Sequence, residues 1–252
     1  MALICGIDEA GRGPIIGPLV ICGAVIDEKD GARLKSIGVK DSKLLTPKQR
    51  EDLFDKVKSI VKSYKILIIE PDEIDDAVES DTLNLNWLEA IKSAEIMHEL
   101  EKDVKFEKAI LDCPSNNISA YKNYVKNEFK KLESKNKINT PDKSDKKHSV
   151  INIIAEHKAD FNYPVVSAAS ILAKVTRDAE IHKIEQKVRK ELGNAVNIGS
   201  GYPSDPYTQK FLKENYKKFT GIFRKSWSTY KDITNVEIKA KAAKLQKKLG
   251  EF

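Results

Sequence analysis

The sequence has few cysteines, tryptophans and methionines, and it has no apolar run long enough to cross a bilayer. Its three cysteines, Cys5, Cys22 and Cys113, lie in or beside apolar runs without the paired spacing of a zinc site, so we expect reduced core residues. The N-terminus lacks the charged head, apolar middle and small-residue cleavage site of a secretory signal. We therefore expect a cytoplasmic protein without a membrane segment.

Acidic residues are scarce near the C-terminus. Residues 208–252 carry 12 Lys and Arg against 4 Asp and Glu, a net charge of +8, whereas the whole chain has +6. An acidic body with a basic tail is typical of a protein whose tail grips a polyanion, although a solvated lysine-rich surface fits the same counts. A chain of 252 residues with 40% hydrophobic and 33% charged residues is a soluble globular protein.

Runs rich in Ile and Val alternate with helical patterns, which predicts an α/β fold: a sheet layered with helices. We expect one α/β domain over residues 1–195 and a basic helical region over residues 196–252, with a last helix starting at Thr234. The polar segment Glu133–His148 is predicted to be an exposed loop. The expected strands cover residues 2–8, 18–27, 65–71, 107–114 and 149–157, and the expected helices start near residues 46, 82, 118 and 164.

Acidic residues follow the predicted strands at the point where each strand ends. Asp8 and Glu9 end the first strand, Asp112 ends the strand in AILDCP, and Asp160 precedes the long helix at Pro164. Parallel neighbouring strands would bring these carboxylates to one sheet edge, where they cannot all stay ionised without a cation. Oxygen ligands suit Mg²⁺ or Mn²⁺, and two such ions serve phosphodiester hydrolysis. Alternatively, each acidic residue simply ends a strand or precedes a turn.

The segment Gly11-Arg12-Gly13 follows the first strand directly. Its glycine spacing and the following Pro14 exclude a dinucleotide-binding fingerprint, which would lead into a helix. Two glycines flanking an arginine let the backbone approach a ligand closely while the guanidinium holds a phosphate.

Six motifs in consistent order make the chain resemble ribonuclease HII, the type 2 ribonuclease H. A seventh, FRKSWST, is more similar to the archaeal and eukaryotic branch of that family than to the bacterial one. The resemblance extends over roughly residues 3–230. The six motifs are GIDEAGRGPIIGPLV, GVKDSKLL, AILDCP, AEHKAD, VVSAASILAKVTRD and GSGYPSDP.

The resemblance implies a ribonuclease H-like fold, a mixed five-stranded sheet flanked by helices with an antiparallel second strand. By motif position, it assigns catalysis and the binding of Mg²⁺ or Mn²⁺, as two ions, to Asp8, Glu9, Asp112 and Asp160. It also implies cleavage of the RNA strand of RNA–DNA hybrids and cleavage 5′ of single ribonucleotides embedded in duplex DNA. The products would carry 3′-hydroxyl and 5′-phosphate ends, and the archaeal branch favours a monomer.

The same resemblance implies a set of substrate-binding residues. The turn Gly11-Arg12-Gly13 would contact the 2′-hydroxyl, and Tyr202 would pack on the neighbouring sugar, although an ordinary turn aromatic fits there too. Lys43 and Lys174 are placed for backbone phosphates, and Lys43 also fits an ordinary surface lysine. The spacing puts Ser170, Lys174 and Arg177 on one helix face. His157 is assigned no catalytic role.

Two other classes of protein remain possible on the sequence. One is a related carboxylate-metal nuclease or resolvase that recognises branched DNA, and the other is a non-catalytic nucleic-acid-binding module of the same fold. The lysines of the last helix should add salt-dependent affinity for duplex, so its removal from Thr234 onward should raise KM more than it lowers kcat.

Overall fold

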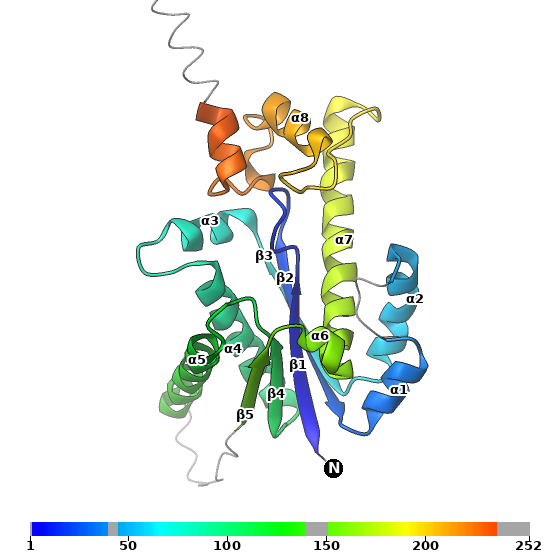
Figure 1. The fold of residues 1–252 in the computed structure, drawn as a ribbon, viewed down its shortest axis with the longest axis vertical. Helices are drawn as coiled ribbons and strands as arrows, with labels where there is room; N and C mark the ends of the chain where they lie inside the picture. Colours follow the sequence, from blue (N-terminus) through cyan, green and yellow to red (C-terminus); the bar gives the residue numbers. More distant parts are fainter. Residues whose placement is uncertain (1, 40–44, 140–150, 236–252) are drawn as a thin grey trace, which may run out of the picture.

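The computed structural model describes residues 2–39, 45–139 and 151–235. Its centre is a five-stranded sheet in the order β3-β2-β1-β4-β5 (Figure 1). β1 pairs antiparallel with β2, β2 pairs antiparallel with β3, and β1, β4 and β5 run parallel. The expected mixed five-stranded sheet with an antiparallel second strand is therefore confirmed.

The strands and helices alternate along the chain after the first hairpin, as the hydrophobic pattern predicts. In chain order they are β1 (Leu3–Ala10), β2 (Leu19–Asp27), α1 (Asp30–Ser36), α2 (Pro47–Lys58), β3 (Ser63–Ile69), α3 (Pro71–Glu79), α4 (Leu85–Asp103), β4 (Lys108–Asp112), α5 (Ile118–Asn139), β5 (Asn152–Glu156), α6 (Ala159–Asn162), α7 (Pro164–Leu192), α8 (Pro206–Asn215) and the 3₁₀ turn η2 (Thr220–Ile222).

Helices cover both faces of the sheet, and each face has its own apolar cluster. α3, α4 and α5 lie on one face and α1, α2 and α7 on the other (Figure 1). Gly6 of β1 allows the close approach of α7, because a Cβ atom there would lie 2.6 Å from the backbone of Val165 and Val166. The first turns of α7 are thereby held against the end of β1 that carries Asp8.

A third apolar cluster joins the C-terminal region to the β1–β2 connection. Ile15 and Ile16 of that connection pack with Phe211 and Phe223, and Val188 of α7 completes the contact. The C-terminal region consequently lies beyond one end of the sheet, against the β1–β2 connection and the far half of α7 (Figure 1).

Several local predictions are corrected by the structure. Residues 133–139 belong to α5 rather than to a loop; the segment has few apolar residues but no Gly or Pro that would end the helix. Residues 140–148 lie outside the described part. Thr234 does not start a helix: residues 228–235 are helical, and its hydroxyl donates to the Tyr230 carbonyl at 2.9 Å. The short helices α1 and α3 were not expected.

Other predictions are confirmed. Thr46 and Gln49 form the expected capping box at the start of α2. Cys5, Cys22 and Cys113 are free and buried. Across the described ranges, no helix combines the length and apolar character that a membrane span requires.

Candidate active site

Three carboxylates meet at the carboxyl ends of β1 and β4. Ile7 of β1 pairs with Leu111 of β4 in the parallel ladder. Asp8 and Asp112 are the next residues along these two neighbouring strands. One ligand atom each from Asp8, Glu9 and Asp112 lies within 4.8 Å of the others. This group has the oxygen donors that Mg²⁺ and Mn²⁺ prefer, and its mutual repulsion is what a bound cation would remove.

Asp8 is the most enclosed member of this group, at 4% exposure. Its pKa is raised to about 7, first by burial and to a lesser extent by the charges of Asp112 and Asp160. The Lys174 charge and a hydrogen bond from the Ser170 side chain lower it. The pKa of Glu9 is also well above its usual range, first because of burial and then because of Asp8. The site therefore gathers more carboxyl groups than the single neighbouring Lys174 can neutralise.

Ser170 and Lys174 reach the acidic group from α7. The Lys174 Nζ atom donates to the Ser170 hydroxyl oxygen at 2.7 Å, as the i, i+4 spacing allows. Since both side chains act on Asp8, the structure places them beside the carboxylates rather than on a separate phosphate-binding surface.

The segment after β5 orients Asp112. The Ala159 N–H donates to Asp112 Oδ1 at 2.8 Å. This geometry depends on Lys158, the one non-glycine residue with positive φ (60°) in the described ranges. Asp160 is 2% exposed at the start of α6, and its charge acts on Asp8, although the three-residue group does not include it. His157 is turned to the Cys113 carbonyl, with its Nδ1 atom 2.8 Å from that oxygen.

The turn Gly11–Gly13 is fixed by two residues that follow it by more than 200 positions. Arg224, fully buried, donates to the carbonyls of Gly11 at 2.6 Å, Arg12 at 2.9 Å and Gly17 at 3.1 Å. The Trp227 Nε1 atom donates to the Gly13 carbonyl at 3.1 Å, and the Arg224 guanidinium stacks over the Trp227 ring. Burial lowers the pKa of Arg224 to about 9.

The left-handed conformation of Gly11 (φ 88°) brings this turn against α7. A Cβ atom on Gly11 would lie 2.8 Å from the Pro18 carbonyl oxygen and 3.0 Å from Nε of Arg177. In the described part of the chain, Nε and Nη2 of Arg177 are buried without a hydrogen-bond acceptor. Arg177 thus packs against the turn at Gly11, with these two nitrogen atoms enclosed beneath it.

The Arg12 side chain does not project freely toward a ligand. Its Nε atom lies 3.0 Å and 3.2 Å from the two carboxylate oxygens of Glu89, and its Nη2 atom donates to Asn86 Oδ1 at 2.6 Å. Both partners belong to α4. The guanidinium that the sequence suggested for a phosphate is therefore occupied inside the protein.

Tyr202 lies beside the same turn. A Cβ atom on Gly13 would be 3.3 Å from the Tyr202 ring, and Tyr202 as a residue is 47% exposed. Turn and tyrosine together form an open face with one aromatic side. Lys43, the remaining predicted binding residue, lies outside the described residues.

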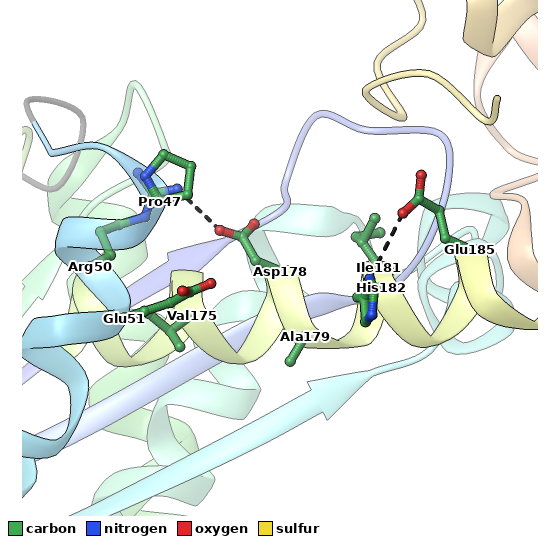
Figure 2. Close-up of a pocket in the computed structure, with 9 residues that line it drawn as sticks. All are labelled: Pro47, Arg50, Glu51, Val175, Asp178, Ala179, Ile181, His182 and Glu185. Carbon is green, nitrogen blue, oxygen red and sulfur yellow. Dashed lines mark hydrogen bonds and ion pairs between the residues drawn. The ribbon is translucent and has the colours of Figure 1, made fainter.

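A pocket of about 650 Å³ lies elsewhere, between α2 and α7 (Figure 2). Two side-chain contacts lie in its lining: Arg50 Nη2 lies 3.1 Å from Asp178 Oδ2, and His182 Nδ1 lies 3.9 Å from Glu185 Oε2. No member of the acidic group lines it. This pocket and the acidic group are thus in different parts of the molecule.

Glu89, Arg224 and Trp227 are the residues that sequence reasoning missed as parts of the site. Glu89 stands in the run LNWLEAIK, where a glutamate is usually a solvated helix residue. Arg224 and Trp227 stand in FRKSWST, which indicated a branch of a family and no physical role. A signal for Glu89 was its position four residues after Leu85 and one before Ala90, on the buried stripe of α4.

Comparisons with known proteins agree with this geometry. The family model described as Ribonuclease HII matches residues 5–230. Ribonuclease HII of Pyrococcus furiosus is 45% identical over 252 residues, covering 99% of this chain and 97% of that protein. The structure of ribonuclease H2 from Pyrococcus horikoshii is similar with a TM-score of 0.73 and 43% identity, covering 92% of this chain and 96% of that one.

A second solved structure, the PCNA:RNase HII complex from Archaeoglobus fulgidus, is similar with a TM-score of 0.69 and 33% identity. It covers 91% of this chain and 96% of that one. The matches span nearly the whole chain and both the acidic group and the turn, so the chain belongs to the ribonuclease HII family of ribonuclease H enzymes.

Proposed function

We propose that this protein is a divalent-metal-dependent endoribonuclease. It cleaves the RNA strand of RNA–DNA hybrids and cuts on the 5′ side of single ribonucleotides in duplex DNA, leaving 3′-hydroxyl and 5′-phosphate ends. The observation that carries the proposal is the acidic group Asp8, Glu9 and Asp112 at the sheet edge, next to a rigid glycine turn. Family membership supports the substrate class.

The residues of the acidic group fit Mg²⁺ or Mn²⁺, because their oxygen donors are desolvated and mutually repulsive. Asp8, Glu9 and Asp112 would hold two ions, with Asp160 as the fourth acidic member. Ions bound there would supply a Lewis acid that activates water and stabilises the leaving oxygen. Ser170 and Lys174 hold Asp8 in place, and the Ala159 N–H selects the orientation of Asp112.

We propose that the turn Gly11–Gly13 reads the ribose through its backbone. Arg224 and Trp227 occupy its carbonyls, and within the described residues no hydrogen bond uses the N–H groups of Arg12 and Gly13. Those N–H groups can donate to a 2′-hydroxyl, which is the feature that separates a ribonucleotide from a deoxyribonucleotide. Tyr202 would pack on the neighbouring sugar, and Arg177 and Lys43 would contact phosphates.

The decisive experiment uses a DNA duplex with one embedded ribonucleotide, an RNA–DNA hybrid and a branched DNA, each with Mg²⁺ or Mn²⁺. We expect cleavage of the first two by the wild type and none by the Asp8→Asn variant. A resolvase would cut the branched DNA alone, and a binding module would shift the ribonucleotide duplex in a gel without cutting it. Either result would refute the proposal.

We also propose that residues 1–195 form the catalytic domain and that residues 196–252 form a duplex-binding region. The described C-terminal lysines, such as Lys210 and Lys213 on α8, would add sequence-independent affinity. A chain ending at Asn235 should show a higher KM with little change in kcat. Loss of turnover at saturating substrate would contradict this division of roles.

The solved relative from Archaeoglobus fulgidus is described as a complex with PCNA. By that likeness we propose that this protein, a cytoplasmic monomer on its own, also binds a PCNA partner. Light scattering of the purified protein with and without PCNA tests both statements. A dimer in the absence of PCNA, or no change of mass in its presence, would contradict the corresponding one.

A further inference from the structure

Glu89 is a buried carboxylate outside the acidic group. It lies in α4, whose neighbouring positions Leu88 and Ala90 belong to the apolar core, and it is 2% exposed. Burial raises its pKa to about 7. A charge in such a place destabilises a protein unless a partner compensates it, so its presence here requires an explanation.

The compensating partner is Arg12, in the middle of the turn. The Nε atom of Arg12 lies within 3.2 Å of both Glu89 oxygens, and Asn86 accepts from its Nη2 atom one helical turn earlier. The two α4 residues thus hold the guanidinium at both ends. This contact spans 77 positions and joins α4 to the β1–β2 connection.

The pair has two effects on the turn. It fixes the Arg12 side chain and with it the direction of the adjacent backbone N–H groups, while Arg224 and Trp227 fix the carbonyls. It also offsets the positive charge of Arg12 with the carboxylate of Glu89. This matters for a polyanion, because the Arg12 side chain is 39% exposed and a phosphate backbone could reach it. An unpaired arginine there would attract any phosphate backbone, with or without ribose.

We propose that Glu89 is a positioning residue for ribonucleotide selectivity. It acts through Arg12: it holds the N–H donors of the turn in the geometry that accepts a 2′-hydroxyl, and it withholds the arginine from nonspecific phosphate contacts. The inference rests on the proposed function, in which this turn reads the ribose. It assigns α4 a part in substrate choice that its place in the apolar core does not suggest.

Glu89→Gln tests the proposal with little change of shape. Dissociation constants are measured without divalent ions for a duplex with one ribonucleotide and for the same duplex in all-DNA form. Affinity for the ribonucleotide duplex should fall about tenfold, since small displacements of binding groups have effects of this size or larger. Affinity for all-DNA duplex should rise about threefold, with a steeper salt dependence, because Arg12 becomes available.

Glu101→Gln is the matched control. Glu101 is also a buried glutamate of α4, it pairs with Lys105 at 3.2 Å, and it lies in the last turns of the helix. This variant should leave both dissociation constants unchanged. In Mg²⁺, Glu89→Gln should raise KM for the ribonucleotide duplex about tenfold with kcat within about twofold of the wild type.

Two further variants keep the test decisive if Glu89→Gln folds poorly. Asn86→Ala should lower affinity for the ribonucleotide duplex about threefold without tightening all-DNA binding, because no charge is freed. The double variant Arg12→Gln/Glu89→Gln should lose no more selectivity than Arg12→Gln alone, since the two residues act as a unit.

The proposal is overturned if Glu89→Gln and Asn86→Ala keep the wild-type ratio of the two dissociation constants, or if all-DNA affinity falls together with ribonucleotide affinity. The first result would give Glu89 a purely structural role. A wild-type protein that does not prefer the ribonucleotide duplex would instead refute the proposed function itself, which this design reveals before any variant is examined.

Discussion

The acidic group and the glycine turn lie next to each other at one end of β1, and their electrostatics are opposite. Around Asp8 the carboxylates outnumber the neighbouring lysine, and the pKa values of Asp8 and Glu9 are raised. At the turn, Arg12 is paired with Glu89, and the carbonyls of Gly11 and Arg12 accept from Arg224. The acidic group keeps an excess of carboxyl groups, whereas the Arg12 side chain and the carbonyls of the turn are hydrogen-bonded within the protein.

This difference teaches how the two tasks are divided. A metal site gains from clustered carboxylates, because the ion's binding energy then includes the relief of their mutual repulsion. A recognition surface gains from completeness, because donors that are already oriented lose less entropy on binding. Substitutions in the acidic group should therefore lower catalytic activity, whereas substitutions around the turn should lower selectivity or stability.

The largest effect is expected from Asp8→Asn. Removing a ligand and its charge from the acidic group should lower kcat on a ribonucleotide duplex at least about a thousandfold, equivalent to about 4 kcal/mol. Steady-state cleavage assays in Mg²⁺ measure it. The matched control Asp27→Asn removes another buried aspartate, at the opposite end of the β1–β2 ladder, and should retain activity.

The turn should respond to Arg224→Lys mainly through stability. A lysine cannot reproduce the planar fork that serves three carbonyls, so unfolding in urea should show a loss of about 3 kcal/mol. Arg189→Lys, at an exposed ion pair with Glu185, should change stability little. An equal loss in both variants would remove the distinction between a completed turn and an ordinary surface.

The acidic group should respond to pH in the metal-free protein. The pKa of Asp8 is about 7 in the folded state against 3.8 ordinarily, so the folded state keeps a proton that the unfolded chain releases. The free energy of unfolding therefore falls as pH rises from about 4 to about 7. Asp8→Asn should raise the Tm of metal-free protein by about 5 °C at pH 8 and leave it unchanged at pH 4.

Excess Mg²⁺ should reverse that order at pH 8, because the ion stabilises the wild type more than the variant. Thermal unfolding followed by circular dichroism covers all of these conditions. If the Asp8→Asn variant were less stable than the wild type in metal-free buffer at pH 8, the ionised Asp8 carboxylate would not destabilise the folded protein as expected.

The smallest effect is expected at Lys158, a residue of the segment that orients Asp112. Its positive φ directs the Ala159 N–H to Asp112, at a conformational cost to a non-glycine residue. Lys158→Gly should stabilise the protein by about 0.5 kcal/mol, and Lys158→Ala should not. Urea unfolding distinguishes these outcomes, and stabilisation by both substitutions would show that backbone strain is not the cause.

The sequence predicted the acidic group well, because strand ends are set by local pattern. Asp8, Glu9 and Asp112 each follow an apolar run, and parallel pairing of β1 and β4 then brings them together. The surroundings of the turn could not be predicted in this way. Glu89 and Arg224 reach it from 77 and more than 200 positions away, so local spacing does not indicate that either residue contacts the turn, even though Glu89 stands on the buried stripe of α4.

The errors in the helices have a similar origin. The polar end of α5 has little apolar periodicity, so the hydrophobic pattern ended that helix too early. The start expected at Thr234 came from the capping-box pattern of Thr234 and Glu237, but residues 228–235 are already helical. α1 has seven residues and one buried side chain, Leu34, which is too little for a periodic pattern. Long-range pairing and short helices thus escape a method based on local spacing.

The hydrogen bonds from Arg224 and Trp227 to the turn also have a consequence for the newly synthesised chain. These contacts close a loop of more than 200 residues, and they can form only after residues 224 and 227 have been synthesised. A polypeptide interrupted before residue 224 already contains each of the four acidic residues assigned to metal binding, but it lacks both donors that hold the turn. On the function proposed above, discrimination between sugars would therefore require the end of the chain, whereas the acidic residues are present well before it.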